Sequence, residues 1–162
     1  MRIKSNYLLY NGIKYKCTIG NGGFSSKKKE GDGCTPIGVF QITDILYRAD
    51  KLKNLVTNYN LQTISSSDGW CDDPNSKYYN TKIKFPFANS AEELFRADDR
   101  YDIICVTNHN RNPIISGAGS AIFIHVASED YSATAGCVAL SLNDLTEILS
   151  TLTKTTELYF GL

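Results

Sequence analysis

The segment from Ala121 to Asp144, AIFIHVASEDYSATAGCVALSLND, constrains the fold more than any other part of this sequence. Its first seven residues form an apolar run that predicts a buried strand. A loop, a tight turn at Gly136 and a second short strand follow, and a helix begins near Ser141. The ten Tyr and seven Phe residues, with many Thr, Ile and Val, also favour strands. We therefore expect a mainly β fold.

Local signals predict several further elements. Asn11-Gly12 is a favoured two-residue hairpin turn, so residues 6–19 predict a β-hairpin. A helix is predicted over Ser141–Leu152, with Ser141 as its N-cap, and a second, shorter one over Ser90–Phe95, where Ser90 and Glu93 match a capping box. No repeat, linker or low-complexity tail divides the chain. The expected architecture is a sandwich or barrel of mixed strands with one or two short helices, in a single domain over residues 1–162.

Charge and composition exclude several classes of protein. Lys and Arg together number 17, as do Asp and Glu, which argues against nucleic acid as a partner. No apolar run approaches the length of a membrane span. The five cysteines include no Cys-x-x-Cys pair, so we expect no metal site, no cofactor and mostly reduced thiols. His109 has no spaced partner and is interpreted as a surface residue. We expect a monomer.

Two loops have alternative interpretations. The glycine-rich stretch over residues 20–36 contains Lys27, Lys28 and Lys29, which predict a solvated, mobile loop, with a flap over a groove as the alternative. The stretch over residues 65–80 combines turn residues with Trp70, Tyr78 and Tyr79. It is interpreted either as an aromatic binding wall or as a loop that Trp70 anchors on the core.

His125 and Cys137 are the candidate reacting groups. An imidazole in an apolar strand must find a partner or face a cleft. Gly136 lets the chain turn sharply before the thiol. Backbone N–H groups at such a turn can stabilise an oxyanion. We expect the helix that begins at Ser141, together with His125, to lower the pKa of Cys137 and to make it the most readily alkylated of the five thiols. A backbone carbonyl after His125 is expected to orient the ring.

Several motifs, in this order, resemble the bacterial L,D-transpeptidases of the YkuD type over residues 20–145. The segments that carry the resemblance are Glu30-Gly31-Asp32-Gly33, Thr35-Pro36-Ile37-Gly38-Val39-Phe40, Gly69-Trp70-Cys71-Asp72-Asp73-Pro74, Tyr79-Asn80, residues 117–125 and the Thr134-Ala135-Gly136-Cys137 turn.

The resemblance implies a mainly β fold that carries Cys and His in a groove. It implies a cysteine acyltransferase that attacks an amide of a peptidoglycan stem peptide and passes the acyl group to an amine. Cys137 would be the nucleophile, His125 the base and Gly136 part of the oxyanion turn. The candidate substrate-binding residues are Trp70, Asp73, Tyr79 and Thr134. Carbapenems would act as covalent inhibitors.

The turn departs from the commonest pattern of this family, Ser-His-Gly-Cys followed by an apolar residue and Arg or Asn. Ala135 replaces the histidine, and Ala139 replaces the polar residue. Two alternatives therefore stand beside the transpeptidase: an L,D-carboxypeptidase that passes the acyl group to water, and an idle peptidoglycan-binding module. The family implies a periplasmic or cell-envelope location. No signal peptide is visible in the sequence, so a cytoplasmic location is the alternative.

Overall fold

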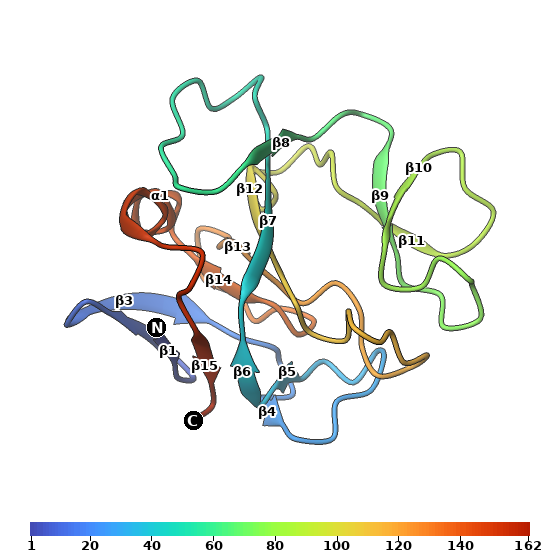
Figure 1. The fold of residues 1–162 in the computed structure, drawn as a ribbon, viewed down its shortest axis with the longest axis horizontal. Helices are drawn as coiled ribbons and strands as arrows, with labels where there is room; N and C mark the ends of the chain where they lie inside the picture. The colour runs from blue at the N-terminus through green and yellow to red at the C-terminus, as the bar shows by residue number, and fades with distance from the viewer.

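The N-terminal hairpin forms where its turn residues predict it. Asn11 and Gly12 both have positive φ, 48° and 79°, and they join β2 (Tyr7–Tyr10) to β3 (Ile13–Thr18). Tyr15 and Cys17 point into the core, whereas Ile13 at the tip of the hairpin is 49% exposed. The computed structural model describes residues 1–162 and is mainly β (Figure 1).

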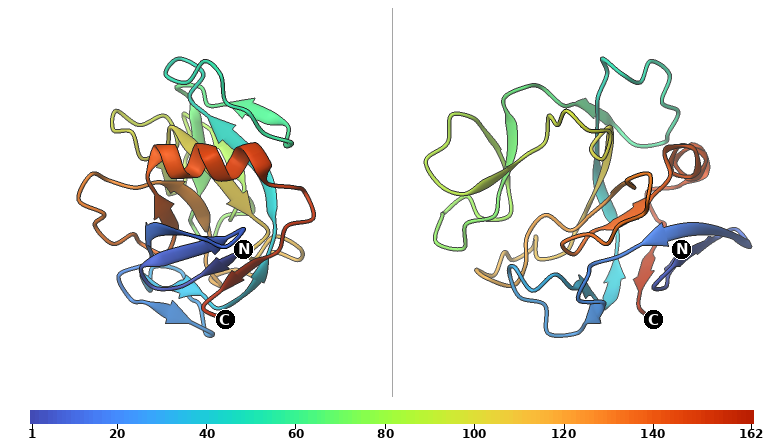
Figure 2. Two further views of the ribbon diagram at one scale, coloured as in Figure 1. Left: turned by 90° about the vertical axis from the view of Figure 1, so that its left-hand side faces the viewer. Right: turned by 180° about the vertical axis from the view of Figure 1, so that it is seen from behind.

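Ten strands form one mixed sheet. In spatial order they are β6 (Gly38–Phe40), β15 (Leu158–Phe160), β1 (Arg2–Ile3), β2, β3, β14 (Val138–Leu140), β13 (Phe123–Val126), β12 (Ile103–Thr107), β7 (Ile42–Tyr47) and β8 (Leu61–Thr63). Three neighbouring pairs are parallel: β1 with β15, β13 with β14, and β7 with β8. The first and last strands of the chain therefore lie side by side (Figure 2).

The sheet curls on itself. β6 lies at one edge and β7 is next to the other edge, yet only Gln41 separates them in sequence. A single residue cannot span a flat ten-stranded sheet, so the two ends of the sheet must approach each other. The expected mainly β fold of mixed strands is thus confirmed.

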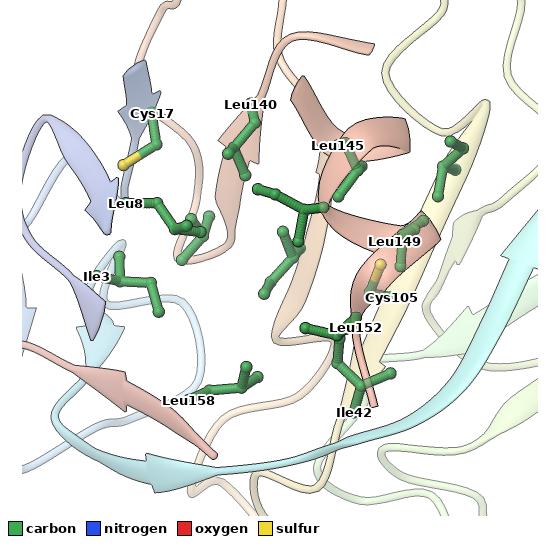
Figure 3. Close-up of a cluster of buried hydrophobic side chains, with 14 of the residues drawn as sticks. Ile3, Leu8, Cys17, Ile42, Cys105, Leu140, Leu145, Leu149, Leu152 and Leu158 are labelled. Carbon is green, nitrogen blue, oxygen red and sulfur yellow. The ribbon is translucent and has the colours of Figure 1, made fainter. Parts of the chain in front are cut away.

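The inside of the curl holds the larger hydrophobic core (Figure 3). Along β12, Ile103 and Cys105 point into this core, while Ile104 and Val106 point to a second cluster on the other face. Both faces of the central strands are therefore buried. The second cluster includes Cys137.

One helix, α1 (Leu142–Thr151), completes the larger core. Its N-cap is Ser141, whose Oγ accepts a hydrogen bond from the N–H of Asp144 at 3.1 Å, as predicted. Leu145, Ile148 and Leu149 are buried and join the core. No helix of the protein has the length and apolarity that crossing a membrane requires.

Two small sheets flank the large one. The first has the order β10 (Lys82–Lys84), β9 (Asp68–Cys71) and β11 (Ala91–Glu93), and the second pairs β4 (Phe24–Ser25) with β5 (Thr35–Pro36). The helix predicted over Ser90–Phe95 is wrong, because this segment forms β11. So short a helix gains little from its own hydrogen bonds. Pairing with β9 offers the same backbone groups a ladder of hydrogen bonds instead.

Candidate active site

A cavity of about 360 Å³ opens beside the start of β13 and β14. It is lined by residues from five parts of the chain: the lysine-containing loop, the β9–β11 sheet, the segment before β12, β13 with the residues that precede it, and the loop and turn around Cys137. His125 and Cys137 both line it. The fold therefore brings the two candidate reacting residues to the same cavity.

The register of two parallel strands sets how these residues lie. His125 of β13 pairs with Ala139 of β14, and Cys137 lies two residues before Ala139. Side chains alternate along a strand, so Cys137, Ala139 and His125 share one face of the sheet. Ala139 also lines the cavity. Cys137 and His125 are therefore diagonal neighbours.

The imidazole of His125 is held from two sides. Its Nδ1 lies 2.8 Å from the carbonyl oxygen of Val126, which can only accept, so Nδ1 carries the proton and Nε2 is left as an acceptor. The ring of Tyr101 meets the imidazole edge to face, with ring centroids 5.1 Å apart and an angle of 82°. The expected backbone carbonyl that orients the ring is thus that of Val126.

The two groups are both uncharged at neutral pH. Burial lowers the pKa of His125 to about 4, although the carbonyls of Val126 and Arg100 oppose that shift. Burial and then the negative charge of Glu92 raise the pKa of Cys137 to about 12, against the opposing effects of the Phe123 N–H group and Lys28. The expectation of a lowered thiol pKa is therefore wrong. One reason is that α1 begins beyond the far end of β14, away from the sulfur.

The turn before Cys137 is tied down by two threonines. Thr134 Oγ1 donates to the Cys137 carbonyl at 2.7 Å and accepts from the Gly136 N–H at 3.1 Å. Thr35, which is fully buried, donates from Oγ1 to the Gly136 carbonyl at 2.8 Å. The backbone N–H of Cys137 forms no hydrogen bond within the protein. It is thus available at the edge of the cavity, where an oxyanion would need a donor.

Gly136 is required at its position for two reasons. Its φ is 145°, which L side chains rarely adopt. A Cβ atom built on it would lie 2.8 Å from the carbonyl oxygen of Cys34. The turn and the loop that ends near Cys34 are therefore packed backbone against backbone.

Asn80 links the wall behind the cavity to the thiol. Its Oδ1 accepts from Trp70 Nε1 at 3.0 Å and from the Ala121 N–H at 3.1 Å. Its Nδ2 donates to the carbonyls of His109 and Asn110. Ala121, held in this way at a φ of 52°, accepts the S–H of Cys137 at 3.0 Å. Sequence reasoning did not single out Asn80 as a site residue, although it follows Tyr79 in one of the matching motifs.

Of the four predicted substrate-binding residues, one lines the cavity and three do not. Thr134 lines the cavity, whereas Trp70, Asp73 and Tyr79 do not. Trp70 is 3% exposed and packs edge to face on Phe123, which matches the alternative of an anchor on the core. Tyr79 is buried and donates to Glu30, which does line the cavity. Asp73 accepts from the backbone N–H of Asn75 and from Asn89.

Sequence reasoning missed most of the charged lining. The charged or phenolic side chains that it did not single out are Lys28, Glu30, Asp72, Glu92, Arg96, Arg100 and Tyr101. The side chain of Lys28 is only 7% exposed and pairs with Asp32 at 2.5 Å, so the prediction of a solvated lysine is wrong there. His109 is also more than a surface residue, because it packs on Phe40 and its Nε2 lies 3.1 Å from the Ala118 carbonyl oxygen. The sequence analysis predicted Asp73 as a site residue, whereas its neighbour Asp72 is the one that lines the cavity.

All five cysteines are unpaired, and no group of three or more His, Cys, Asp and Glu side chains is arranged to hold a metal ion.

No curated protein matches the sequence. The sequence model of the L,D-transpeptidase catalytic domain, YkuD, matches residues 4–159. That match spans nearly the whole chain and includes both candidate reacting residues, His125 and Cys137. The protein therefore belongs to the YkuD family of L,D-transpeptidase catalytic domains.

Proposed function

We propose that this protein is a cysteine acyltransferase that acts on peptidoglycan stem peptides and crosslinks them through a thioester acyl-enzyme. The family implies peptidoglycan as the substrate. The observation that carries the proposal is the shared cavity: one thiol and one imidazole, with Nε2 unprotonated, lie on the same face of two paired strands.

The first half of the reaction uses groups already in place. The Sγ of Cys137 attacks the amide carbonyl carbon while its proton passes to Nε2 of His125. Because both groups are neutral at rest, this transfer accompanies the attack and does not precede it. The backbone N–H of Cys137 receives the oxyanion. When the C–N bond breaks, the imidazolium returns the proton to the leaving amine, and a thioester remains on Cys137.

The second half decides between the two enzymatic alternatives. An amine of another stem that attacks the thioester forms a new amide and gives a crosslink, whereas water gives a trimmed peptide. In both cases the C–S bond breaks and the sulfur regains a proton. Incubation of the purified protein with tetrapeptide stems and muropeptides, followed by mass spectrometry, distinguishes crosslinked from trimmed products.

A covalent inhibitor tests the nucleophile. We expect a carbapenem to add its mass to the wild-type protein and to leave the Cys137→Ala variant unmodified. Cys105→Ala is the matched control, since Cys105 is fully buried in the larger core, away from the cavity. An adduct on Cys137→Ala would overturn the assignment, and no adduct or turnover with the wild-type protein would favour the idle binding module. An envelope location is a further part of the proposal, and fractionation of the source cells tests it.

A further inference from the structure

The cavity contains carboxylates that form no ion pair with a cation of the protein. Glu30, Asp72 and Glu92 all line it, and none of them forms an ion pair. The cations of the cavity are already paired with other acids. Lys28 pairs with Asp32, and both Arg96 and Arg100 pair with Asp98. The lining itself carries three cations and three carboxylates. Asp32 and Asp98 lie beside those cations, so five carboxylates face three cations around the cavity.

Asp72 and Glu92 face the same side of the small sheet. Trp70 of β9 pairs with Glu92 of β11, and Asp72 lies two residues after Trp70. Residues two apart on a strand share a face, so the two carboxylates are neighbours. Their proximity also contributes to the raised pKa of Glu92, whose main cause is burial. The hydroxyl of Tyr101 and the charge of Arg96 oppose that shift.

The hydrogen bonds of these carboxylates are incomplete. Glu92 Oε1 accepts from the Tyr101 hydroxyl at 2.5 Å, and Oε2 has no partner. Asp72 Oδ1 is buried and has no partner. In another wall, the hydroxyl of Ser120, a residue that is 7% exposed, has no partner either. Buried polar atoms normally find partners, so the unpaired state of Asp72 Oδ1 and Ser120 Oγ points to polar groups that arrive with a ligand.

We propose that Asp72 and Glu92 bind the acceptor amine, a primary ammonium group of the second substrate. This inference rests on the proposed acyl transfer and names the group that resolves the thioester. A primary alkyl amine is protonated at neutral pH, so it enters as a cation and suits two unpaired carboxylates. Glu92 lies against Tyr101, which itself contacts His125, so a bound amine is held beside the reacting groups.

The same site also provides a base that removes a proton from the acceptor ammonium group. An ammonium group has no lone pair and must lose one proton before it can attack. Glu92, with its raised pKa, takes that proton. The nitrogen then attacks the thioester carbonyl carbon, the C–N bond forms and the C–S bond breaks. The second proton passes from the nitrogen through His125 to the sulfur, and Glu92 releases the first proton to solvent after the product leaves.

The partition of the acyl-enzyme tests the inference. The wild-type protein, Glu92→Gln and Asp72→Asn are each given a tetrapeptide stem as donor. The acceptor is either Nα-acetyl-lysine, whose side chain carries an ammonium group at neutral pH, or hydroxylamine, which is uncharged. In Glu92→Gln we expect the yield of lysine adduct relative to hydrolysed stem to fall by about 10²-fold. In Asp72→Asn we expect the KM for the lysine acceptor to rise about tenfold. The ratio of hydroxylamine adduct to hydrolysed stem stays within about twofold of wild type in both variants, because neither of these two reactions needs a carboxylate to bind a cation.

Glu93→Gln is the matched control. Glu93 follows Glu92 on β11, is exposed and does not line the cavity, so its removal deletes the same charge without touching the site. A wild-type partition in both Glu92→Gln and Asp72→Asn overturns the inference, as does a Glu92→Gln protein that no longer forms the acyl-enzyme. If Glu92→Gln does not fold, the acceptor KM of Asp72→Asn decides. A wild-type protein that never forms an acyl-enzyme overturns the proposed function as well, which separates the two failures.

Discussion

The thiol of Cys137 donates its S–H to the carbonyl oxygen of Ala121, with Sγ and oxygen 3.0 Å apart. It makes no hydrogen bond to the imidazole of His125. A carbonyl oxygen can only accept, so this contact stabilises the protonated thiol and agrees with the pKa of about 12 that burial gives it. The resting protein therefore holds its nucleophile uncharged, and the proton must move to His125 when the substrate arrives.

The first prediction concerns the order in which the thiols react. Cys34 is half-buried, whereas the other four cysteines are buried. We expect iodoacetamide at neutral pH to modify Cys34 first and Cys137 more slowly, the reverse of the order expected from the sequence. The modification rate of Cys137 should keep rising as the pH increases above 9, because only the thiolate reacts. Peptide mapping by mass spectrometry measures both. Fast, pH-independent labelling of Cys137 near pH 7 would show that a thiolate is present at rest.

The second prediction concerns Asn80. Its replacement by Ala leaves two buried N–H donors and two carbonyls without their partner, and we expect the free energy of unfolding to fall by roughly 3 kcal/mol. Acylation by a carbapenem should also slow, because Ala121 is no longer held at positive φ beside the sulfur. Denaturant unfolding and stopped-flow kinetics measure the two effects. Asn75→Ala is the control, since the Asn75 side chain is exposed and forms no hydrogen bond. Unchanged acylation in a folded Asn80→Ala protein would separate Asn80 from the site.

The third prediction concerns Gly136. We expect Gly136→Ala to lower the free energy of unfolding by roughly 2–3 kcal/mol, because the new methyl group meets the Cys34 carbonyl in a backbone conformation that Ala avoids. Gly23→Ala is a matched control, since Gly23 also has positive φ, 72°, but no atom lies within 4 Å of the added Cβ. It should cost only about 1 kcal/mol. Equal losses in the two variants would mean that the close packing of the turn contributes nothing.

The fourth prediction concerns the pH dependence of stability. The pKa of His125 falls from its ordinary 6.5 to about 4 on folding. The unfolded chain therefore takes up a proton at a higher pH than the folded protein does. The stability is full above pH 6.5 and is lost as the pH falls to about 4, where this residue has cost about 3 kcal/mol.

His125→Gln removes that contribution, so the loss of unfolding free energy between pH 6.5 and 4 should be smaller in the variant by about this amount. Urea denaturation at a series of pH values measures the difference, and other acid-sensitive groups cancel in the comparison with wild type. Parallel stability curves for the two proteins would show that the imidazole is not held neutral by burial.

The sequence predicts this protein well where the signal is local. The turn at Asn11-Gly12 and the cap at Ser141 each depend on residues within one turn of chain, and both form as expected. The signal for the strand that carries His125 is equally local, since alternation along the sequence shows which residues share each face. The pairing of that strand with β14 decides the neighbours of His125. This pair is parallel and depends on the eleven-residue crossover of residues 127–137, which local alternation does not record.

The failures arise where a distant segment competes with the local signal. Ser90 and Glu93 match a helix start, but pairing with β9 draws the segment into a strand. Lys28 belongs to a run of lysines, yet Asp32 and the cavity wall bury it. The pKa of Cys137 depends on how deeply tertiary packing buries it, which no short motif records.

The two walls of the cavity belong to different sheets. The wall with His125 and Cys137 is part of the ten-stranded sheet, and the wall with Asp72 and Glu92 belongs to the separate sheet of β9, β10 and β11 (Figure 1). Evolution can therefore exchange β11, which carries Glu92, for that of a relative and alter which molecule is accepted, while Asn80, His125 and Cys137 keep their places. Grafting that segment between family members is a direct route to engineered selectivity.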